Sequence, residues 1–355
     1  ETLFQVASMS MPVSAWVVMT LVEDGRLDLD QPVSTYLTRW ELPPSEFNTD
    51  AVTVRRLLSH TAGLTDGLGY LGFAPGDEPQ SLEESLMRAT DALPPGDGII
   101  AVGNPPGAAW QYSGGGYTIL QLLVEEVTGQ SFSNYADQAV LDPLGMTSAQ
   151  FGWSDDLEAR LAGNYSGDRQ TDDVLRFSSL AAAELYATAS EMALFAAAAA
   201  EGPNGEPAGR DVLSAQTVGR IISPHSEAVQ GSVPVWTLGY QLYQQTETGY
   251  VIGHQGTNVP GLFHVFLVDP ATGDGIVMMG TGGPVAPRLA CEWITWNTGR
   301  ISNACTPFFV VPAIRPAVIV AFGGIIVIAI AVYILVPLIA PRVGQRIGEG
   351  ATESE

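Results

Sequence analysis

Lysine is missing from this chain, although the sequence is 355 residues long. All 15 residues of the Lys+Arg count are arginines, against 38 acidic residues, and the formal net charge is −23. This excess of negative charge excludes a nucleic-acid-binding protein, because few side chains remain to neutralise phosphates. An acidic, lysine-free surface fits a high-salt or extracytoplasmic setting. A GC-rich genome gives the same composition, so both interpretations stay open.

Cysteine and histidine are scarce as well, with two and four residues. His225 and His264 have no neighbours at the spacing of metal ligands, so we expect neither a metal nor a cofactor. Cys291 and Cys305 lie close together in the sequence. In an oxidising compartment a disulfide between them would close a loop of about fourteen residues, worth ~3 kcal/mol. The alternative is two free buried thiols.

One long apolar run stands near the C-terminal end. Residues 317–340 carry no charge, and as a helix at ~1.5 Å per residue they would span ~36 Å, more than the ~30 Å core of a bilayer. We predict a transmembrane helix there, after a juxtamembrane linker at 301–316 and before a short polar tail at 341–355. The expected partners are the lipid bilayer and other subunits of a membrane complex.

Arginines on either side of the run indicate its orientation. Arg342 and Arg346 follow it, whereas only Arg315 precedes it closely, which favours a cytoplasmic tail. The main domain, residues 1–300, is then extracytoplasmic, either periplasmic or extracellular. No signal peptide is visible, and the start at Glu1 has the character of the middle of a domain, so we expect residues upstream that are absent from this sequence.

The hydrophobic period changes along the chain. Helical spacing, with caps and glycine stops, predicts helices at 10–23, 54–58, 82–90, 117–128, 132–141 and 181–200. Alternating apolar residues then predict strands at 236–244, 249–253, 262–269 and 275–280, followed by a helix at 287–296. Helices first and an antiparallel sheet last indicate an α+β fold.

Three short motifs occur in order along this pattern: Ser8-Met9-Ser10-Met11, Tyr112-Ser113-Gly114 and His254-Gln255-Gly256. Together they resemble the serine β-lactamase and penicillin-binding protein family, most of all the branch with Tyr in the second motif. That branch includes class C β-lactamases, DD-peptidases and esterases. Further stretches match in order: Gly25-Arg26-Leu27-Asp28-Leu29-Asp30, Leu57-Leu58-Ser59-His60-Thr61-Ala62-Gly63-Leu64, Pro143-Leu144-Gly145-Met146 and Ala187-Thr188-Ala189-Ser190-Glu191-Met192.

The resemblance implies a β-lactamase/DD-peptidase-like fold, an antiparallel sheet flanked by helices with a helical subdomain. The family's strands upstream of the nucleophile are absent from this sequence or lie in another piece. By resemblance, Ser8 would attack an acyl carbonyl, with its N–H and one near Thr257 as the oxyanion hole. Tyr112 would exchange protons with the nucleophile and the leaving group. His254 would line the opposite wall of the cleft.

Residues beside these three would bind the substrate. The resemblance assigns that role to Ser113, Gln255, Gly256 and Thr257. At position 114, where the family often has Asn, this chain has Gly, so the amide that grips substrate is absent. His60 is expected to be a turn or core histidine rather than a catalyst.

The first motif departs from the family at one position. The family has Ser-x-x-Lys, and Met11 occupies the lysine position. A thioether neither accepts the Ser8 proton nor carries charge, whereas its length and shape suit the same channel. The fold should therefore tolerate Met11, although the chemistry should not.

Three interpretations follow. The chain is a membrane-anchored serine hydrolase of peptides, β-lactams or esters, impaired by Met11. Alternatively, it is a pseudoenzyme that serves as a binding module or accessory subunit. Thirdly, Met11 is an introduced, inactivating change.

Overall fold

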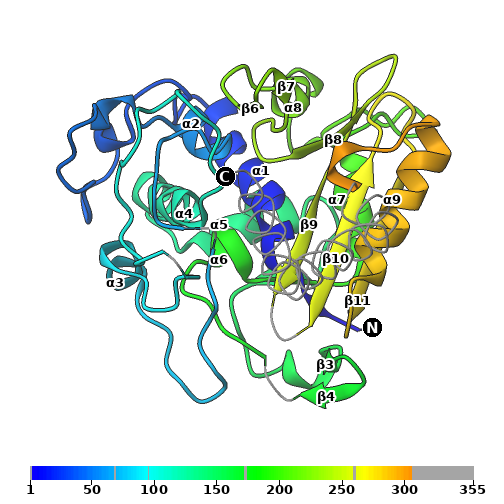
Figure 1. Ribbon diagram of the computed structural model, residues 1–355, viewed down its shortest axis with the longest axis horizontal. Coiled ribbons are helices and arrows are strands. Elements are labelled where there is room, and N and C mark those ends of the chain that lie inside the picture. The colour runs from blue at the N-terminus through cyan, green and yellow to red at the C-terminus, as the bar shows by residue number, and fades with distance from the viewer. Residues whose placement is uncertain (1, 68, 95, 172–173, 259–260, 306–355) are drawn as a thin grey trace, which may run out of the picture. The chain divides into compact units, whose positions relative to one another are not determined.

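The period-two stretch in the last third of the chain forms an antiparallel sheet (Figure 1). The computed structural model describes residues 2–67, 69–94, 96–171, 174–258 and 261–305. Within them the main sheet has the strand order β11-β10-β9-β8. Its strands are β8 (Gln241–Gln245), β9 (Tyr250–Asn258), β10 (Leu262–Val268) and β11 (Gly275–Thr281).

The helices lie mostly before this sheet in the sequence, which confirms the predicted α+β class. They are α1 (Ser10–Glu23), α2 (Val54–Leu58), α3 (Leu82–Met87), α4 (Gly114–Thr128), α5 (Phe132–Ala136), α6 (Leu180–Ala183), α7 (Ala189–Ala198), α8 (Ala215–Ile222) and α9 (Val285–Thr298). Short helical turns are η1 (Ala7–Met9), η2 (Val33–Thr35), η3 (Thr49–Ala51), η4 (Asp137–Leu141), η5 (Glu158–Arg160) and η6 (Asn303–Cys305).

Short strands complete the described elements. β1 (Phe4–Gln5), β5 (Leu185–Ala187) and β2 (Gln150–Phe151) form a small sheet in the order β1-β5-β2. Two further hairpins are β3 (Asn164–Ser166) with β4 (Arg169–Thr171), and β6 (Val229–Gln230) with β7 (Val233–Pro234).

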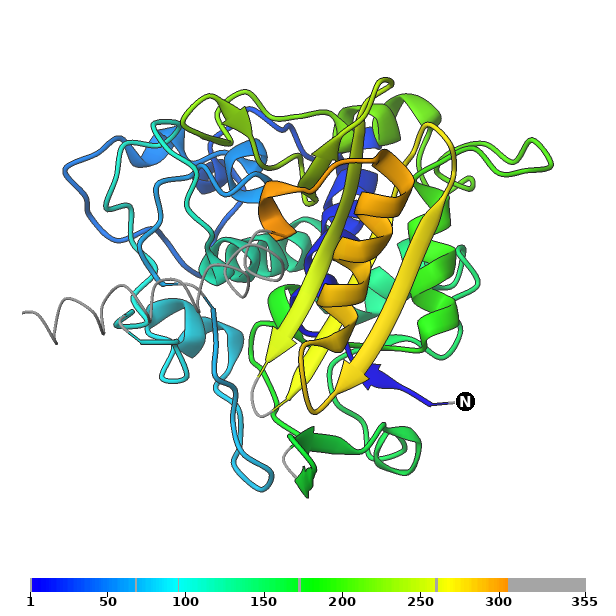
Figure 2. The same cartoon turned by 45° about the vertical axis from the view of Figure 1, so that its right-hand side comes forward.

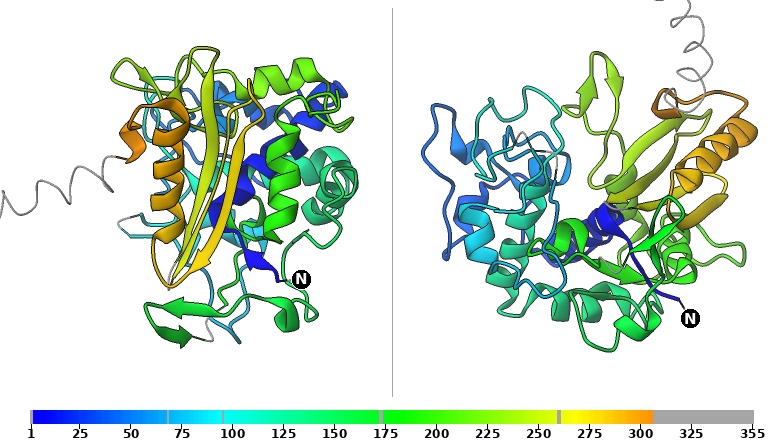
Figure 3. Two further views of the ribbon diagram at one scale, coloured as in Figure 1. Left: turned by 90° about the vertical axis from the view of Figure 1, so that its right-hand side faces the viewer. Right: turned by 60° about the horizontal axis from the view of Figure 1, so that its bottom comes forward.

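Helices cover both faces of the main sheet. α9 and α7 both contact β10 and β11, and they do so from opposite sides of the sheet (Figures 2 and 3). The strand β9, which carries the third motif, contacts α1 and η1. The sheet thus presents the third motif to the start of α1.

The helix that follows the first motif is buried along most of its length. Every residue of α1 from Ser10 to Leu21 is buried, as expected of a helix that is apolar on all sides. It contacts α4, α6 and β9. The indole N–H of Trp16 donates to the Tyr240 hydroxyl at 2.8 Å, which satisfies a buried donor. The N-terminal end of α1 therefore lies between the sheet and the helical part, where the site forms.

The prediction of one continuous helix over residues 181–200 is wrong near its start. The chain leaves α6, extends as β5 and re-enters a helix at α7. β5 is paired on both sides, with β1 and with β2. Thr188 then starts α7 in a capping box with Glu191. Strand pairing at long range thus overrides the helix propensity of an Ala-rich run.

Other predicted boundaries shift by a few residues. The first strand begins at Gln241 rather than at 236, because Trp236 pairs with Gln241 across a turn. The second strand extends to Asn258 and so includes the whole third motif. The helix predicted at 132–141 ends as an α-helix at Ala136 and continues as the wider turn η4.

The predicted transmembrane segment, residues 317–340, lies outside the described residues. Within the described part of the chain, no helix is both long and apolar enough to span a bilayer. Both cysteines are disulfide-bonded, so neither is a free thiol.

Candidate active site

Ser8 lies at a tight turn that leads into α1. Ala7 has a left-handed backbone (φ 51°) although it carries a Cβ, a strained conformation of the kind found at functional sites. The Ser10 hydroxyl donates to the Ala7 carbonyl at 2.6 Å and accepts from the Leu185 N–H at 3.0 Å. β5 therefore holds the turn in place. Ser8 itself is half-buried and borders a cavity.

Met11 lies one helical turn further along. Its side chain is buried, and the Tyr112 hydroxyl donates a hydrogen bond to its sulfur at 3.1 Å. The Ser8 side chain lies near the same hydroxyl, close enough to lower the pKa of Tyr112. The structure thus places the nucleophile position, the lysine position and the second-motif tyrosine around one cavity.

Tyr112 is held as a neutral phenol. Burial raises its pKa to about 12, although the nearby Ser8 side chain acts in the opposite direction. With that pKa, the phenolate lies ~7 kcal/mol above the phenol at pH 7. A thioether is a weak acceptor without charge, so Met11 does not stabilise the phenolate.

A cluster of aromatic rings fixes Tyr112. The centroid of the His60 ring lies 4.5 Å from that of Tyr112, and that of Trp236 lies 5.8 Å from it. Trp236 is also 5.3 Å from His254. Offset and edge-to-face contacts of this kind favour one orientation of each ring. His60 is buried in a left-handed turn (φ 57°), which agrees with the expected turn or core histidine.

Both histidines of this cluster are neutral near pH 7. Burial lowers the pKa of His254 to about 4. Burial, helped by the nearby His254, lowers the pKa of His60 well below its usual range. His254 Nδ1 lies 2.7 Å from the Gln255 carbonyl oxygen, whereas Nε2 of either ring bonds to no described residue. Neither histidine therefore supplies positive charge beside Tyr112.

The second motif caps α4. Ser113 Oγ accepts from the Gly116 N–H at 2.9 Å and donates to Asp66 Oδ1 at 2.6 Å. Asp66 Oδ2 accepts from the Gly115 N–H at 2.8 Å. A carboxylate at a helix N-terminus is favourable, although burial raises the pKa of Asp66. Ser113 is therefore engaged with α4 and is not among the residues that line the cavity.

The third motif lies on β9 beyond the end of its pairing with β8, which reaches Gly253. Gly256 approaches the carbonyl of Val6 so closely that a Cβ would lie 2.0 Å from that oxygen. Gln255 and Thr257 are exposed on alternate positions. Thr257 lines the cavity, whereas Gln255 does not.

The cavity over Ser8 measures about 270 Å³. Met11 and Tyr112 line it together with Gly114 and Tyr70. A Cβ on Gly114 would lie 2.7 Å from the Tyr70 ring, so this ring occupies the space of a side chain at position 114. Ser8, Met11, Tyr112 and Thr257 all line the cavity, whereas His254, expected on its opposite wall, does not. The centroid of the His254 ring lies 6.4 Å from that of Tyr112.

Sequence reasoning missed two residues of this site. Asp66 and Tyr70 stand in an irregular loop, and no motif or period marks them. The only signal is indirect: the glycines at 114 and 115 leave room that another side chain must fill. Among the described residues, no three His, Cys, Asp or Glu side chains lie close enough together to hold a metal ion.

Comparisons with known proteins agree with this geometry. The Beta-lactamase family matches residues 1–295. The chain is 28% identical to Penicillin-binding protein 4 of Amycolatopsis lactamdurans over 331 residues, 89% of this chain and 81% of that protein. It is 34% identical to Esterase EstB of Burkholderia gladioli over 161 residues, only 42% of this chain and 39% of the esterase.

A solved structure has the same fold. The penicillin-binding protein from Bacillus halodurans is superimposed with a TM-score of 0.63 at 22% identity, covering 82% of this chain and 85% of that one. At that identity the likeness concerns the fold alone. The family match over most of the chain, with the motif residues gathered round one cavity, shows that this chain belongs to the beta-lactamase family of serine hydrolases.

Proposed function

We propose that this chain is a β-lactamase-related serine hydrolase whose acyl transfer is strongly impaired and whose Ser8 cavity serves mainly to bind ligands. The observation that carries the proposal is the hydrogen bond from the Tyr112 hydroxyl to the Met11 sulfur. The peptides, β-lactams and esters of the family's chemistry are the classes of substrate from which such ligands would come.

Acyl transfer is impaired because the Tyr112 hydroxyl keeps its proton and so cannot accept the proton of Ser8. To attack a carbonyl, Ser8 must lose its proton to a nearby base, and the Tyr112 hydroxyl lies near the Ser8 side chain. A neutral tyrosine accepts no proton of consequence until it has lost its own. With Met11 in place and both nearby histidines neutral, no positively charged group among the described residues stabilises the Tyr112 phenolate.

Labelling with a fluorophosphonate probe tests this proposal. The present sequence should label weakly at Ser8, and Met11→Lys should raise the labelling rate ~10²-fold, the lower end of general-base effects. Met11→Leu, which keeps the shape without adding charge, is the matched control and should not raise it. Ser8→Ala should abolish any labelling. Rapid labelling of Ser8 in the present sequence would overturn the proposal.

We also propose that residues 317–340 anchor the domain in a membrane, with the main domain extracytoplasmic. Their uncharged sequence supports this. The full chain should stay with membranes after alkaline carbonate extraction, and protease added to the outside of intact cells should remove the main domain. Release into the carbonate supernatant would contradict the anchor.

A second candidate function is that of an accessory subunit without catalysis of its own. The exposed apolar side chains of α9 favour it, since Leu289 is 40% and Trp296 82% exposed. Extraction in a mild detergent should then give a large complex that survives size-exclusion chromatography. A monomer under those conditions would speak against this candidate.

A further inference from the structure

The cavity over Ser8 is lined by uncharged groups. Ser8, Tyr112 and Thr257 contribute hydroxyls, and much of the remaining lining is apolar, including Leu93 and Phe263. No Asp, Glu, Arg or His is among the described residues that line it, and the chain contains no lysine. The cavity therefore offers hydrogen bonds but no countercharge.

Countercharge decides which ligands such a cavity accepts. A carboxylate that enters must give up its water, and this is costly unless a cation takes the place of that water. An ester or amide carries no net charge and needs only a few hydrogen bonds. The lining thus favours a neutral ligand over an anion of the same size.

Tyr70 limits the size of the ligand. Its hydroxyl is 2.6 Å from Thr118 Oγ1, which in turn is 2.7 Å from Ser179 Oγ, so the ring is fixed at its far end. The ring itself stands beside Gly114, where a side chain would otherwise project. The resulting volume of about 270 Å³ lies just below the ~300–1,000 Å³ usual for small-molecule sites.

We propose that the Ser8 cavity selects small, neutral acyl compounds, esters or amides with an apolar group, against compounds that carry a carboxylate, and that Tyr70 sets the size limit. This inference rests on the proposed function, because it names the ligands of the same cavity. The two proposals can be tested separately, because ligand selection requires only equilibrium binding and no acyl transfer.

Matched ligands test the charge preference. Phenylacetamide and phenylacetate are alike in size and differ in charge, and their binding to the full chain near pH 7 can be followed by calorimetry or ligand-observed NMR. We expect the amide to bind at least tenfold more tightly. Met11→Lys places a cation in the lining and should raise the affinity for phenylacetate at least tenfold. Equal affinities, tighter binding of the carboxylate, or binding of neither ligand would overturn the inference.

Position 70 tests the size limit. Tyr70→Ala should admit 1-naphthylacetamide at least tenfold more tightly than the present sequence does. Tyr70→Phe keeps the ring and should still exclude it, which also controls for the lost hydroxyl. Exclusion by a folded Tyr70→Ala variant would contradict the role of Tyr70. Rapid fluorophosphonate labelling would overturn the proposed impairment of acyl transfer. It would not bear on the binding preference, which these titrations alone test.

Discussion

Gly256 allows β9 to approach closely the turn that carries Ser8. A Cβ at this position would lie 2.0 Å from the Val6 carbonyl oxygen, a backbone atom that cannot move aside as a flexible side chain can. Any side chain there must push the strand and the turn apart. The close approach of the two backbones thus requires glycine at this position of the third motif.

We expect Gly256→Ala to reduce the free energy of unfolding by about 2–4 kcal/mol, the range of severe overpacking changes. Urea denaturation followed by tryptophan fluorescence measures this loss. Gly249→Ala is the matched control, because nothing lies within 4 Å of the added Cβ. A Gly256→Ala variant as stable as Gly249→Ala would show that the approach is looser than described.

Met11 and Gly114 show how much of the site can be predicted from single residues of the sequence. The sequence predicts that Met11 fills the lysine channel, and the buried sulfur against Tyr112 fits that prediction. It also shows that the family's amide is absent at Gly114. It does not show what replaces that amide, because Tyr70 reaches the site from a loop more than forty residues earlier. Contacts of that kind have no local signature in a sequence.

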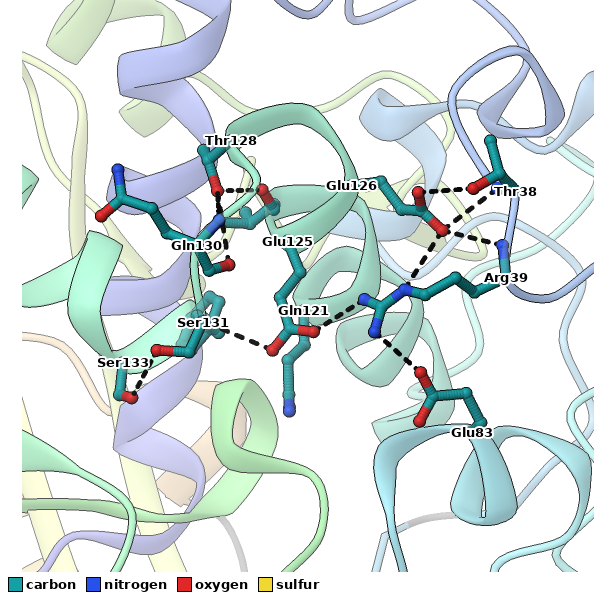
Figure 4. A network of polar contacts seen from close by, with 12 residues as sticks. Thr38, Arg39, Glu83, Gln121, Glu125, Glu126, Thr128, Gln130, Ser131 and Ser133 are labelled. Atoms are coloured by element: carbon teal, nitrogen blue, oxygen red, sulfur yellow. Dashed lines mark hydrogen bonds and ion pairs between the residues drawn. The ribbon is translucent and has the colours of Figure 1, made fainter.

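At the scale of elements, Arg39 joins three segments (Figure 4). Its guanidinium contacts Glu83 on α3 at 2.7 Å, and Glu125 and Glu126 on α4 at 2.7 and 3.4 Å. Glu126 also accepts from the backbone N–H of Thr38. One cation thus balances three carboxylates in a chain with few cations.

Arg39→Gln should lower stability by about 1–2 kcal/mol, more than an isolated surface pair, because it leaves three carboxylates close together. The loss should shrink in 1 M salt, which screens their repulsion. Thermal unfolding at low and high salt measures both effects. Arg288→Gln removes only the exposed pair with Glu292 and should change stability by less than about 0.5 kcal/mol. A loss at Arg39 that does not depend on salt would rule out the electrostatic explanation.

Elements with one clear period were predictable from the sequence. α1 has the predicted bounds, and the alternation in residues 262–280 gives β10 and β11 within a residue or so. The region of 181–200 was not predictable, because a run of alanines suits a helix and nothing local marks the pairing of β5 with β1 and β2. Local propensity thus fails where a strand is held by partners far away in the sequence.

For the molecule as a whole, a buried acid should make stability depend on pH. Glu184 accepts from the Tyr186 hydroxyl at 3.2 Å, and burial raises its pKa to about 8. Because this folded-state pKa exceeds the unfolded value of 4.5, its contribution to stability is complete below pH ~4.5 and is lost as the pH rises through about 8.

Glu184→Gln removes this titration. We expect the Tm of the variant, relative to the unmodified chain, to rise by several degrees between about pH 5 and about pH 8. Glu78→Gln, at an exposed position, is the control and should give a difference that stays constant with pH. A constant difference for Glu184→Gln as well would mean that Glu184 is ionised in the folded chain throughout this range.

Position 11, beside the Tyr112 hydroxyl, is also a convenient place from which to measure how the site alters the ionisation of an amine. Since the sequence holds no lysine, a lysine introduced at position 11 would be its only side-chain amine. Reductive methylation with a ¹³C reagent labels primary amines. In this sequence it would label the new lysine and otherwise only an N-terminal amine, so the lysine resonance would be easy to assign. The chemical shift of that resonance, followed against pH, would report directly how the tyrosine hydroxyl and the surrounding apolar wall alter the ionisation of an ammonium group.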